Sequence, residues 1–228
     1  MKVSVLMPVY NEVKTIMDVL ELVNSVGFEK EIVVVDDCST DGTKEILKNG
    51  FGNGTGDMKI FYHEKNMGKG AAIQTALSHA TGNYTIVQDA DMEYSPHDMI
   101  EMARLADTTG AEAVYGSRFL KTRKSTSLPH FFINYFLTSV TNIFFKGSLT
   151  DMETCYKMVK TDIMRDLDIK AKRFDFEPEV TAKLLRRGCI IREVPISYRG
   201  RGYDEGKKIG WRDGIEAIWT LVKLRFKK

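Results

Sequence analysis

The sequence predicts a single-domain α/β fold with a mostly parallel sheet flanked by helices. Short apolar runs rich in β-branched residues alternate with segments whose apolar residues recur at helical spacing. Polar residues collect where three of these runs end, at Pro8-Val9-Tyr10, Asp36-Asp37 and Asp89-Ala90-Asp91. Parallel sheets bind ligands at the carboxyl ends of their strands. The length of 228 residues suits one domain with a well-buried core.

The first half of the chain, residues 1–117, repeats a strand–helix unit. Such units build a parallel sheet that is covered on both faces. The apolar pattern predicts strands at Val3–Met7, Ile32–Val35, Lys59–Tyr62 and Tyr84–Val87, and helices at Thr15–Val26, Thr43–Leu47, Lys69–His79 and from Ser95-Pro96 onward.

The second half, residues 118–228, has a different pattern and we expect it to bind the acceptor of a reaction. It starts with a basic loop, and its tail from Ile196 carries nine basic and four acidic residues. Between them the sequence predicts an aromatic-rich helix within Phe131–Phe145, a strand at Thr154–Val159, a helix at Glu177–Arg187 and a strand at Ile190–Val194.

Composition narrows the class of protein. The formal net charge of +2 is too small to indicate nucleic-acid binding. Three widely spaced cysteines predict neither a disulfide framework nor a zinc site, and the N-terminus runs straight into a strand rather than a signal peptide. The apolar stretch Phe131–Phe145 is too short and too interrupted to span a membrane. We therefore expect a cytoplasmic protein whose membrane contact is peripheral, through amphipathic and basic segments of residues 118–228. The aromatic residues of Phe131–Phe136 and Ile143–Phe145 suit a surface helix at the headgroup boundary, and a buried core helix is equally compatible with them.

Asp89-Ala90-Asp91 is the strongest chemical signal. Alternate carboxylates at the end of a buried strand suit a hard divalent cation, Mg²⁺ or Mn²⁺, that bridges phosphate oxygens, and Glu93 continues the alternation. An isolated pattern of this kind is more often a solvated turn. The two other polar strand ends nearby favour a metal site at Asp89, Asp91 and Glu93.

Two further segments fit an anionic ligand. Asp37 ends a second apolar strand and is assigned to nucleotide contact. In Asn66-Met67-Gly68-Lys69-Gly70, two glycines and Lys69 open a helix, where free N–H groups favour anions. By itself the Asn66–Gly70 segment is weak evidence for an anion site, and its sequence does not match a Walker-type phosphate loop.

Taken together, Val3–Asn11, Val33–Thr43, Asn66–Gly70, Gln88–Glu93 and Gly116–Phe119 resemble family 2 glycosyltransferases with the A-type fold. The resemblance extends to dolichyl-phosphate mannose synthases and other polyprenyl-phosphate sugar transferases. It implies that residues 1–117 bind a nucleotide sugar, with Pro8, Tyr10, Glu12 and Asp37 at the base and ribose. It also implies that the Asp89-Ala90-Asp91 segment holds metal and diphosphate.

The resemblance assigns roles in the second half as well. Arg118 would clamp a phosphate, and Arg201 and Lys207 would belong to a loop that closes over the diphosphate and the acceptor. Asp151 is a candidate base or acceptor-positioning residue, and a turn or N-cap role is equally compatible with its place in the sequence. Glu177 and Glu179 fit better as helix-start carboxylates.

These expectations combine into one function. The sequence predicts an inverting, metal-dependent transfer of a hexose from GDP-mannose, UDP-glucose or a UDP-N-acetylhexosamine to a polyprenyl (dolichyl or undecaprenyl) phosphate. The enzyme would sit on the cytoplasmic face of the membrane. The alternatives are a family 2 enzyme acting on a glycan or another hydroxyl acceptor, and a non-catalytic module that binds nucleotide sugar or lipid phosphate. A sugar nucleotidyltransferase is disfavoured, because its first loop would be rich in glycine and arginine.

Overall fold

The structure is a computed structural model that describes residues 1–120, 128–200 and 211–226. A seven-stranded sheet in the order β3-β2-β1-β4-β6-β5-β7 forms its centre. The strands are β1 (Val3–Val9), β2 (Lys30–Asp36), β3 (Met58–Tyr62), β4 (Tyr84–Val87), β5 (Ala113–Ser117), β6 (Lys157–Lys160) and β7 (Ile191–Pro195). Only β6 runs antiparallel to its neighbours, β4 and β5. The predicted α/β fold with a mostly parallel sheet is confirmed.

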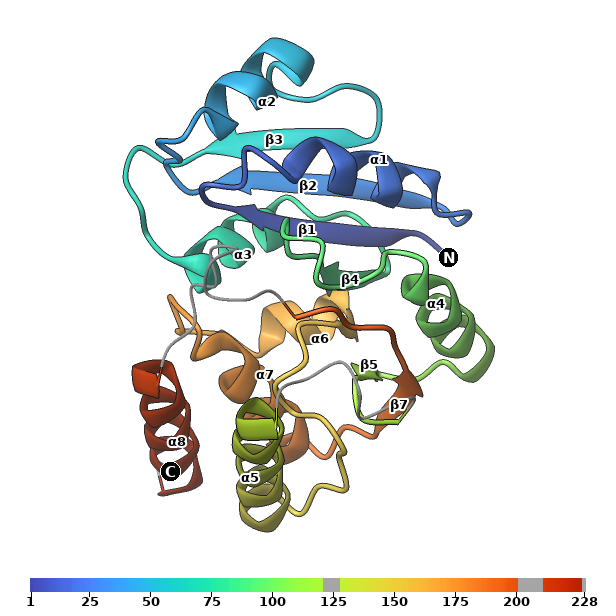
Figure 1. Cartoon of the computed structure of the whole chain (residues 1–228). Coiled ribbons are helices and arrows are strands. Elements are labelled where there is room, and N and C mark those ends of the chain that lie inside the picture. The colour runs from blue at the N-terminus through green and yellow to red at the C-terminus, as the bar shows by residue number, and fades with distance from the viewer. Residues whose placement is uncertain (121–127, 201–210, 227–228) are drawn as a thin grey trace.

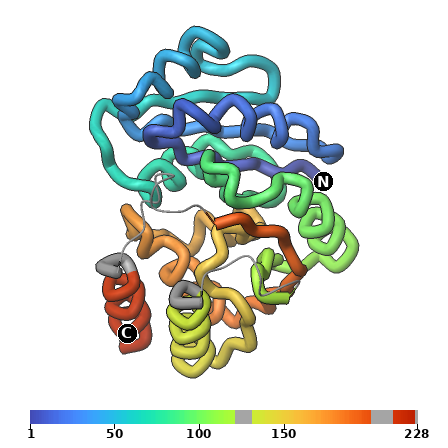
Figure 2. Tube along the Cα trace, in the orientation of Figure 1, coloured from blue at the N-terminus to red at the C-terminus, as the bar shows by residue number. Residues whose placement is uncertain are grey.

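Helices cover the sheet, and α3 packs against β1 and β2, α4 against β5, and α6 against β4 and β6 (Figure 1). The helices are α1 (Ile16–Ser25), α2 (Thr43–Phe51), α3 (Lys69–Ser78), α4 (Asp98–Thr109), α5 (Leu128–Phe145), α6 (Thr161–Asp166), α7 (Phe176–Arg186) and α8 (Trp211–Phe226). Figure 2 shows that the early part of the chain fills one end of the molecule and the late part the other.

The register brings three strand ends to one edge. Val9, the last residue of β1, pairs with Asp36, the last residue of β2, and Leu6 pairs with Val87 at the end of β4. Every residue of β1 and β4 is buried, which explains why these strands are continuous apolar runs. The loops that follow β1, β2 and β4 therefore meet, as the sequence predicts.

Two hydrophobic clusters stabilise the fold. The larger one fills both faces of the sheet. The smaller one joins α5, α7 and α8 through Leu137, Phe145, Met152, Ala182, Ala217 and Leu221. In the described part of the chain, no helix is long and apolar enough to cross a membrane.

Candidate active site

The loop after β1 is tied to the loop after β4. The Thr15 hydroxyl donates a hydrogen bond of 2.7 Å to the Ala90 carbonyl and lies 3.2 Å from a Glu12 carboxylate oxygen. Pro8 is buried at the end of β1, and Tyr10 is half-buried beside it. Pro8, Tyr10, Glu12 and Ala90 therefore belong to one edge of the molecule, as expected for residues that share a ligand.

Asp37 has a structural role that its sequence position does not reveal. Its buried carboxylate accepts hydrogen bonds from the Met67 amide at 2.9 Å and the Gly68 amide at 2.7 Å, and it pairs with His63 Nδ1 at 2.7 Å. Both carboxylate oxygens are thus engaged by the chain itself. Asp37 fixes the loop 63–68 beside the site. A nucleotide that contacted Asp37 would share carboxylate oxygens that already accept these hydrogen bonds.

Lys69 lies between two carboxylates rather than at an open helix end. Its ammonium group is 2.9 Å from Asp89 and 3.0 Å from Glu177, which opens α7. Burial lowers the pKa of Lys69, but the two carboxylates outweigh burial and hold that pKa well above its usual value. The N-terminus of α3 is covered, because the Ala71 amide donates to the Lys172 carbonyl. Lys69 therefore neutralises the aspartate motif and links it to α7.

The aspartate motif fits a divalent cation that is completed by substrate. Asp89 and Asp91 supply two carboxylates, whereas Glu93 accepts a hydrogen bond of 2.8 Å from the Tyr198 hydroxyl. Within the described residues, no three or more His, Cys, Asp or Glu side chains form a group that could hold a metal ion. Mg²⁺ in proteins is often held by one or two carboxylates together with substrate phosphates. The residues present match that mode better than a cage built by protein alone.

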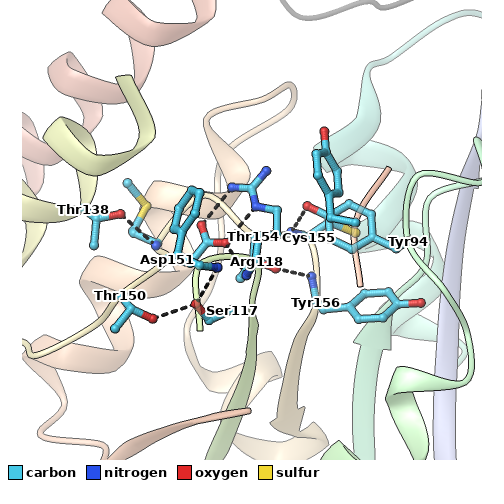
Figure 3. A network of polar contacts seen from close by, with 12 residues as sticks. Tyr94, Ser117, Arg118, Thr138, Thr150, Asp151, Thr154, Cys155 and Tyr156 are labelled. Carbon is cyan, nitrogen blue, oxygen red and sulfur yellow. Dashed lines mark hydrogen bonds and ion pairs between the residues drawn. The ribbon is translucent and has the colours of Figure 1, made fainter. Parts of the chain in front are cut away.

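Arg118 and Asp151 form a buried bidentate ion pair (Figure 3). Arg118 Nε lies 2.7 Å from one carboxylate oxygen, Nη2 lies 2.8 Å from the other, and the Arg118 amide adds a third bond at 3.0 Å. Asp151 is fully buried. The guanidinium group also lies over the Tyr198 ring. This geometry disagrees with Asp151 as a base, because its carboxylate is sequestered by an arginine; it positions Arg118 instead.

Glu153 is a candidate site residue to which the sequence analysis gives no role. Its Oε1 atom is buried and accepts no hydrogen bond from any described residue. Burial, and then the nearby charge of Glu177, raises the pKa of Glu153 to about 7. The only sequence signal is its place two residues after Asp151.

Lys157 is the cation next to this carboxylate. Its ammonium group donates to the carbonyls of Met152 and Thr154 and lies 4.8 Å from the centre of the Tyr115 ring. Burial lowers its pKa to about 8, although Glu177 and Glu153 oppose that shift. Glu153, Lys157 and Glu177 thus form a charged cluster that Lys69 connects to Asp89.

Two predicted residues cannot be placed. Arg201 and Lys207 lie outside the described residues. The segment just before them reaches the site, because Tyr198 contacts Glu93 and the Arg199 amide donates to the Glu93 carbonyl. The structure thus brings together Pro8, Tyr10, Glu12, Lys69, Asp89, Ala90, Asp91 and Glu93 at one edge, with the Arg118–Asp151 pair reaching it through Tyr198.

Known proteins resemble this chain over most of its length. A family model for glycosyl transferase family 2 matches residues 4–168. An uncharacterized protein of Methanocaldococcus jannaschii, MJ0544, is 26% identical over 97% of this chain and 98% of its own length. The low-salt glycan biosynthesis hexosyltransferase Agl6 of Haloferax volcanii is 28% identical over 92% of this chain; the match spans 51% of Agl6.

Solved structures share the fold. Glucosyl-3-phosphoglycerate synthase of Mycobacterium tuberculosis, in complex with Mn²⁺, UDP and phosphoglyceric acid, superposes with a TM-score of 0.73 at 20% identity. The superposition covers 99% of this chain and 78% of that one. Staphylococcus aureus TarS in complex with UDP-GlcNAc gives a TM-score of 0.67 at 22% identity, covering 98% of this chain and 66% of that one.

Proposed function

The chain belongs to glycosyl transferase family 2, and from that premise we propose that it transfers a hexose from a nucleotide diphosphate sugar to a polyprenyl phosphate, with inversion. The observation that carries the proposal is the meeting of Asp89 and Asp91 with the loops after β1 and β2 at one edge of the sheet. A diphosphate held there lies where α/β sheets bind their ligands.

The donor half of the proposal rests on the carboxylates and on the neighbouring structures. One neighbour was crystallised with UDP and Mn²⁺, and another with UDP-GlcNAc. In this chain Asp89 and Asp91 would hold Mg²⁺ or Mn²⁺, which supplies positive charge to the leaving diphosphate. Lys69 adds a fixed positive charge beside Asp89. Pro8, Tyr10 and Glu12 would line the base and ribose, with Asp37 shaping the loop opposite.

The acceptor half of the proposal rests on the pairing of Asp151 with Arg118 and on the cations of the site. A phosphate oxygen is already ionised near neutral pH, so a phosphate acceptor needs no base, and Asp151 is too tightly paired to serve as one. Arg118 retains an Nη1 group that Asp151 does not engage, which suits a phosphate. We assign Arg201 and Lys207 to the same phosphates. With a lipid acceptor, we propose that the enzyme works at the cytoplasmic face of a membrane.

A transfer assay tests this function. Radiolabelled sugars from a panel of UDP and GDP donors are offered with a polyprenyl phosphate and Mn²⁺ or Mg²⁺, and label in the organic phase is counted. We expect metal-dependent label that falls at least about a hundredfold in Asp91→Ala. Transfer only to soluble acceptors would contradict the lipid acceptor but would still support glycosyltransferase activity. Donor binding without any transfer would leave only a binding module.

A second candidate is transfer to a hydroxyl group, and Glu153 favours it. A hydroxyl acceptor needs a base with a pKa near the working pH, and the pKa of Glu153 is about 7. Its buried Oε1 lacks a hydrogen-bond donor among the described residues, so a substrate hydroxyl could supply one. The two candidates differ in whether activity depends on Glu153.

A further inference from the structure

We propose that α5 and α8 together form the face by which this protein lies on an anionic membrane, which we call the α5–α8 face. It comprises Phe132, Phe136, Ile143, Ile215, Trp219 and Phe226. This inference deepens the proposed function, since it names the surface through which a lipid acceptor would be approached.

The outward side of α5 carries large apolar side chains between Phe131 and Phe145. Phe132, Phe136 and Ile143 stand at positions i, i+4 and i+11, which fall on one stripe of a helix, and they are 55–77% exposed. Ile133 and Tyr135 flank the stripe and are also exposed. The helix contains no Asp, Glu, Lys or Arg. An ordinary surface helix shows its polar side to water, and α5 does the reverse.

The outward side of α8 repeats this arrangement. Ile215, Trp219 and Phe226 stand at the same i, i+4 and i+11 spacing and are 56–75% exposed. Ile218 is exposed beside them. The opposite side of the helix carries the buried Ala217 and Leu221. Two helices far apart in the sequence therefore present matching stripes.

The two stripes lie on the same side of the molecule. Helices α5 and α8 contact each other, and both rest on α7. Their inner sides share the small cluster with Leu137, Met152, Ala217 and Leu221. Figure 1 shows α5 and α8 side by side at the end of the molecule away from β1–β3. Since both helices pack on α7 and share the small cluster on their inner sides, we take their exposed stripes to form one face.

The chemistry of this face fits a bilayer better than a second copy of the chain. Trp219 and Tyr135 carry the polar tips that aromatic residues place at the headgroup level. The last turn of α8 carries the basic residues Lys223 and Arg225 and no acidic residue. An anionic surface attracts these charges, at about 1 kcal/mol for each basic residue near it. A second copy would bring the same positive charge.

The α5–α8 face is connected to the site by short contacts. The Met152 amide donates a hydrogen bond of 3.0 Å to the Thr138 hydroxyl on α5 (Figure 3), and Met152 packs in the cluster beneath α8. Its neighbour Asp151 holds Arg118. The helices that would rest on lipid thus carry the loop that orients the arginine assigned to the acceptor phosphate.

Vesicle sedimentation of the whole chain tests the inference, with vesicles of phosphatidylcholine alone and of phosphatidylcholine mixed equally with phosphatidylglycerol. The test variant is Phe136→Ser with Trp219→Ser. The matched control is Ile190→Ser, which changes an exposed apolar residue just before β7 and outside the α5–α8 face. All three side chains are exposed, so folding should survive, and circular dichroism verifies it.

We expect the protein to pellet with the anionic vesicles and the double variant to bind at least about tenfold more weakly, with the control unchanged. Binding should also weaken as salt rises from about 0.1 M to about 1 M, because the Debye length falls from about 10 Å to about 3 Å. Absence of pelleting at low salt, or equal binding by the double variant, would overturn the proposal. So would a dimer in analytical ultracentrifugation that the double variant abolishes while no vesicles bind.

This measurement contains neither donor nor acceptor, so the two proposals can fail separately. Vesicle binding through the α5–α8 face without sugar transfer to lipid would contradict the proposed acceptor alone. Transfer to a detergent-solubilised polyprenyl phosphate without vesicle binding would contradict the α5–α8 face alone.

Discussion

Arg118 and Asp151 are both buried, and each is the charged partner of the other. A buried ion pair adds little net stability, because both ions lose their hydration. Removing one partner is costly, since the other charge stays buried alone. The pair therefore holds the arginine in one orientation, and Asp151 acts through Arg118.

Asp151→Asn should lower the free energy of unfolding by about 3–5 kcal/mol, because the buried guanidinium group loses its counter-charge. Urea denaturation measures the change. The matched control is Asp166→Asn, which breaks an exposed pair with Arg187 at 3.3 Å and should cost at most about 1 kcal/mol. Equal losses in the two variants would contradict the importance of the buried pair.

Glu153 should make stability depend on pH in a defined window. The pKa of Glu153 is about 7 in the folded protein and 4.5 for an unperturbed glutamate. As the pH rises, the unfolded chain therefore loses this proton at a lower pH than the folded protein does. The folded state therefore binds more protons between these values, and stability from this group is present below about pH 4.5 and is lost as the pH rises to about 7. Glu153→Gln should flatten that part of the profile in urea denaturation at a series of pH values.

The same variant separates the two acceptor classes. If the acceptor is a hydroxyl, kcat/KM of the wild type should rise with pH up to about 7, and Glu153→Gln should lose most activity together with that rise. If the acceptor is a phosphate, Glu153→Gln should retain most activity and the same pH dependence as the wild type.

At the scale of elements, the start of α3 is held by a close approach of two backbones. A Cβ atom on Gly70 would lie 2.5 Å from the Ala171 carbonyl oxygen. Because that oxygen belongs to the backbone, one of the two backbone segments would have to move, and the movement would cost free energy. The glycine that the sequence suggested for anion binding is thus required for packing. The segment 171–172 then leads into α7, which carries Glu177 to Lys69.

Gly70→Ala should therefore lower the free energy of unfolding by about 1–3 kcal/mol through overpacking. The control is Gly50→Ala in α2, where an added Cβ meets nothing within 4 Å. That variant should be neutral or more stable by about 0.5–1 kcal/mol, because alanine loses less backbone entropy than glycine in a helix. Thermal unfolding should show a lower Tm for Gly70→Ala and an equal or higher Tm for Gly50→Ala.

Strand β5 and helix α8 are absent from the sequence-based prediction, and strand β6 begins later than predicted. Strand β5 is short and buried, and its apolar run reads equally well as part of the preceding helix. The antiparallel β6 begins at Lys157 rather than Thr154. Helix α8 falls in the tail that starts at Ile196, where the prediction rests on the excess of basic residues and assigns no helix. In each case the neighbours in space, not the local pattern, decide the element.

At the scale of the whole molecule, donor binding should stabilise the fold. The proposed site joins the loops of three strands, so a ligand there favours the folded state by RT ln(1 + [L]/Kd), about 2.7 kcal/mol at a hundredfold excess over Kd. Thermal shifts with UDP, GDP and their sugars, with and without Mn²⁺, measure this effect. The shift should need metal and should vanish in Asp91→Ala. A metal-independent shift that survives the variant would contradict the assigned diphosphate site.

The sequence by itself determined the α/β class, the positions of the first four strands along the chain and the gathering of polar residues at one edge. These follow from hydrophobic periodicity and from residues at strand ends, which are local properties of the chain. Family membership also followed from local motifs, and the family comparison confirms it.

Only the tertiary structure decided which charged groups have partners. Asp151 meets Arg118 across 33 residues, Lys69 meets Glu177 across 108, and the Asp37 oxygens are bound by a loop about 30 residues away. No local pattern contains such pairings, because they depend on how the elements pack. The same holds for the contacts of α5 and α8, two helices far apart in the sequence that meet each other and α7.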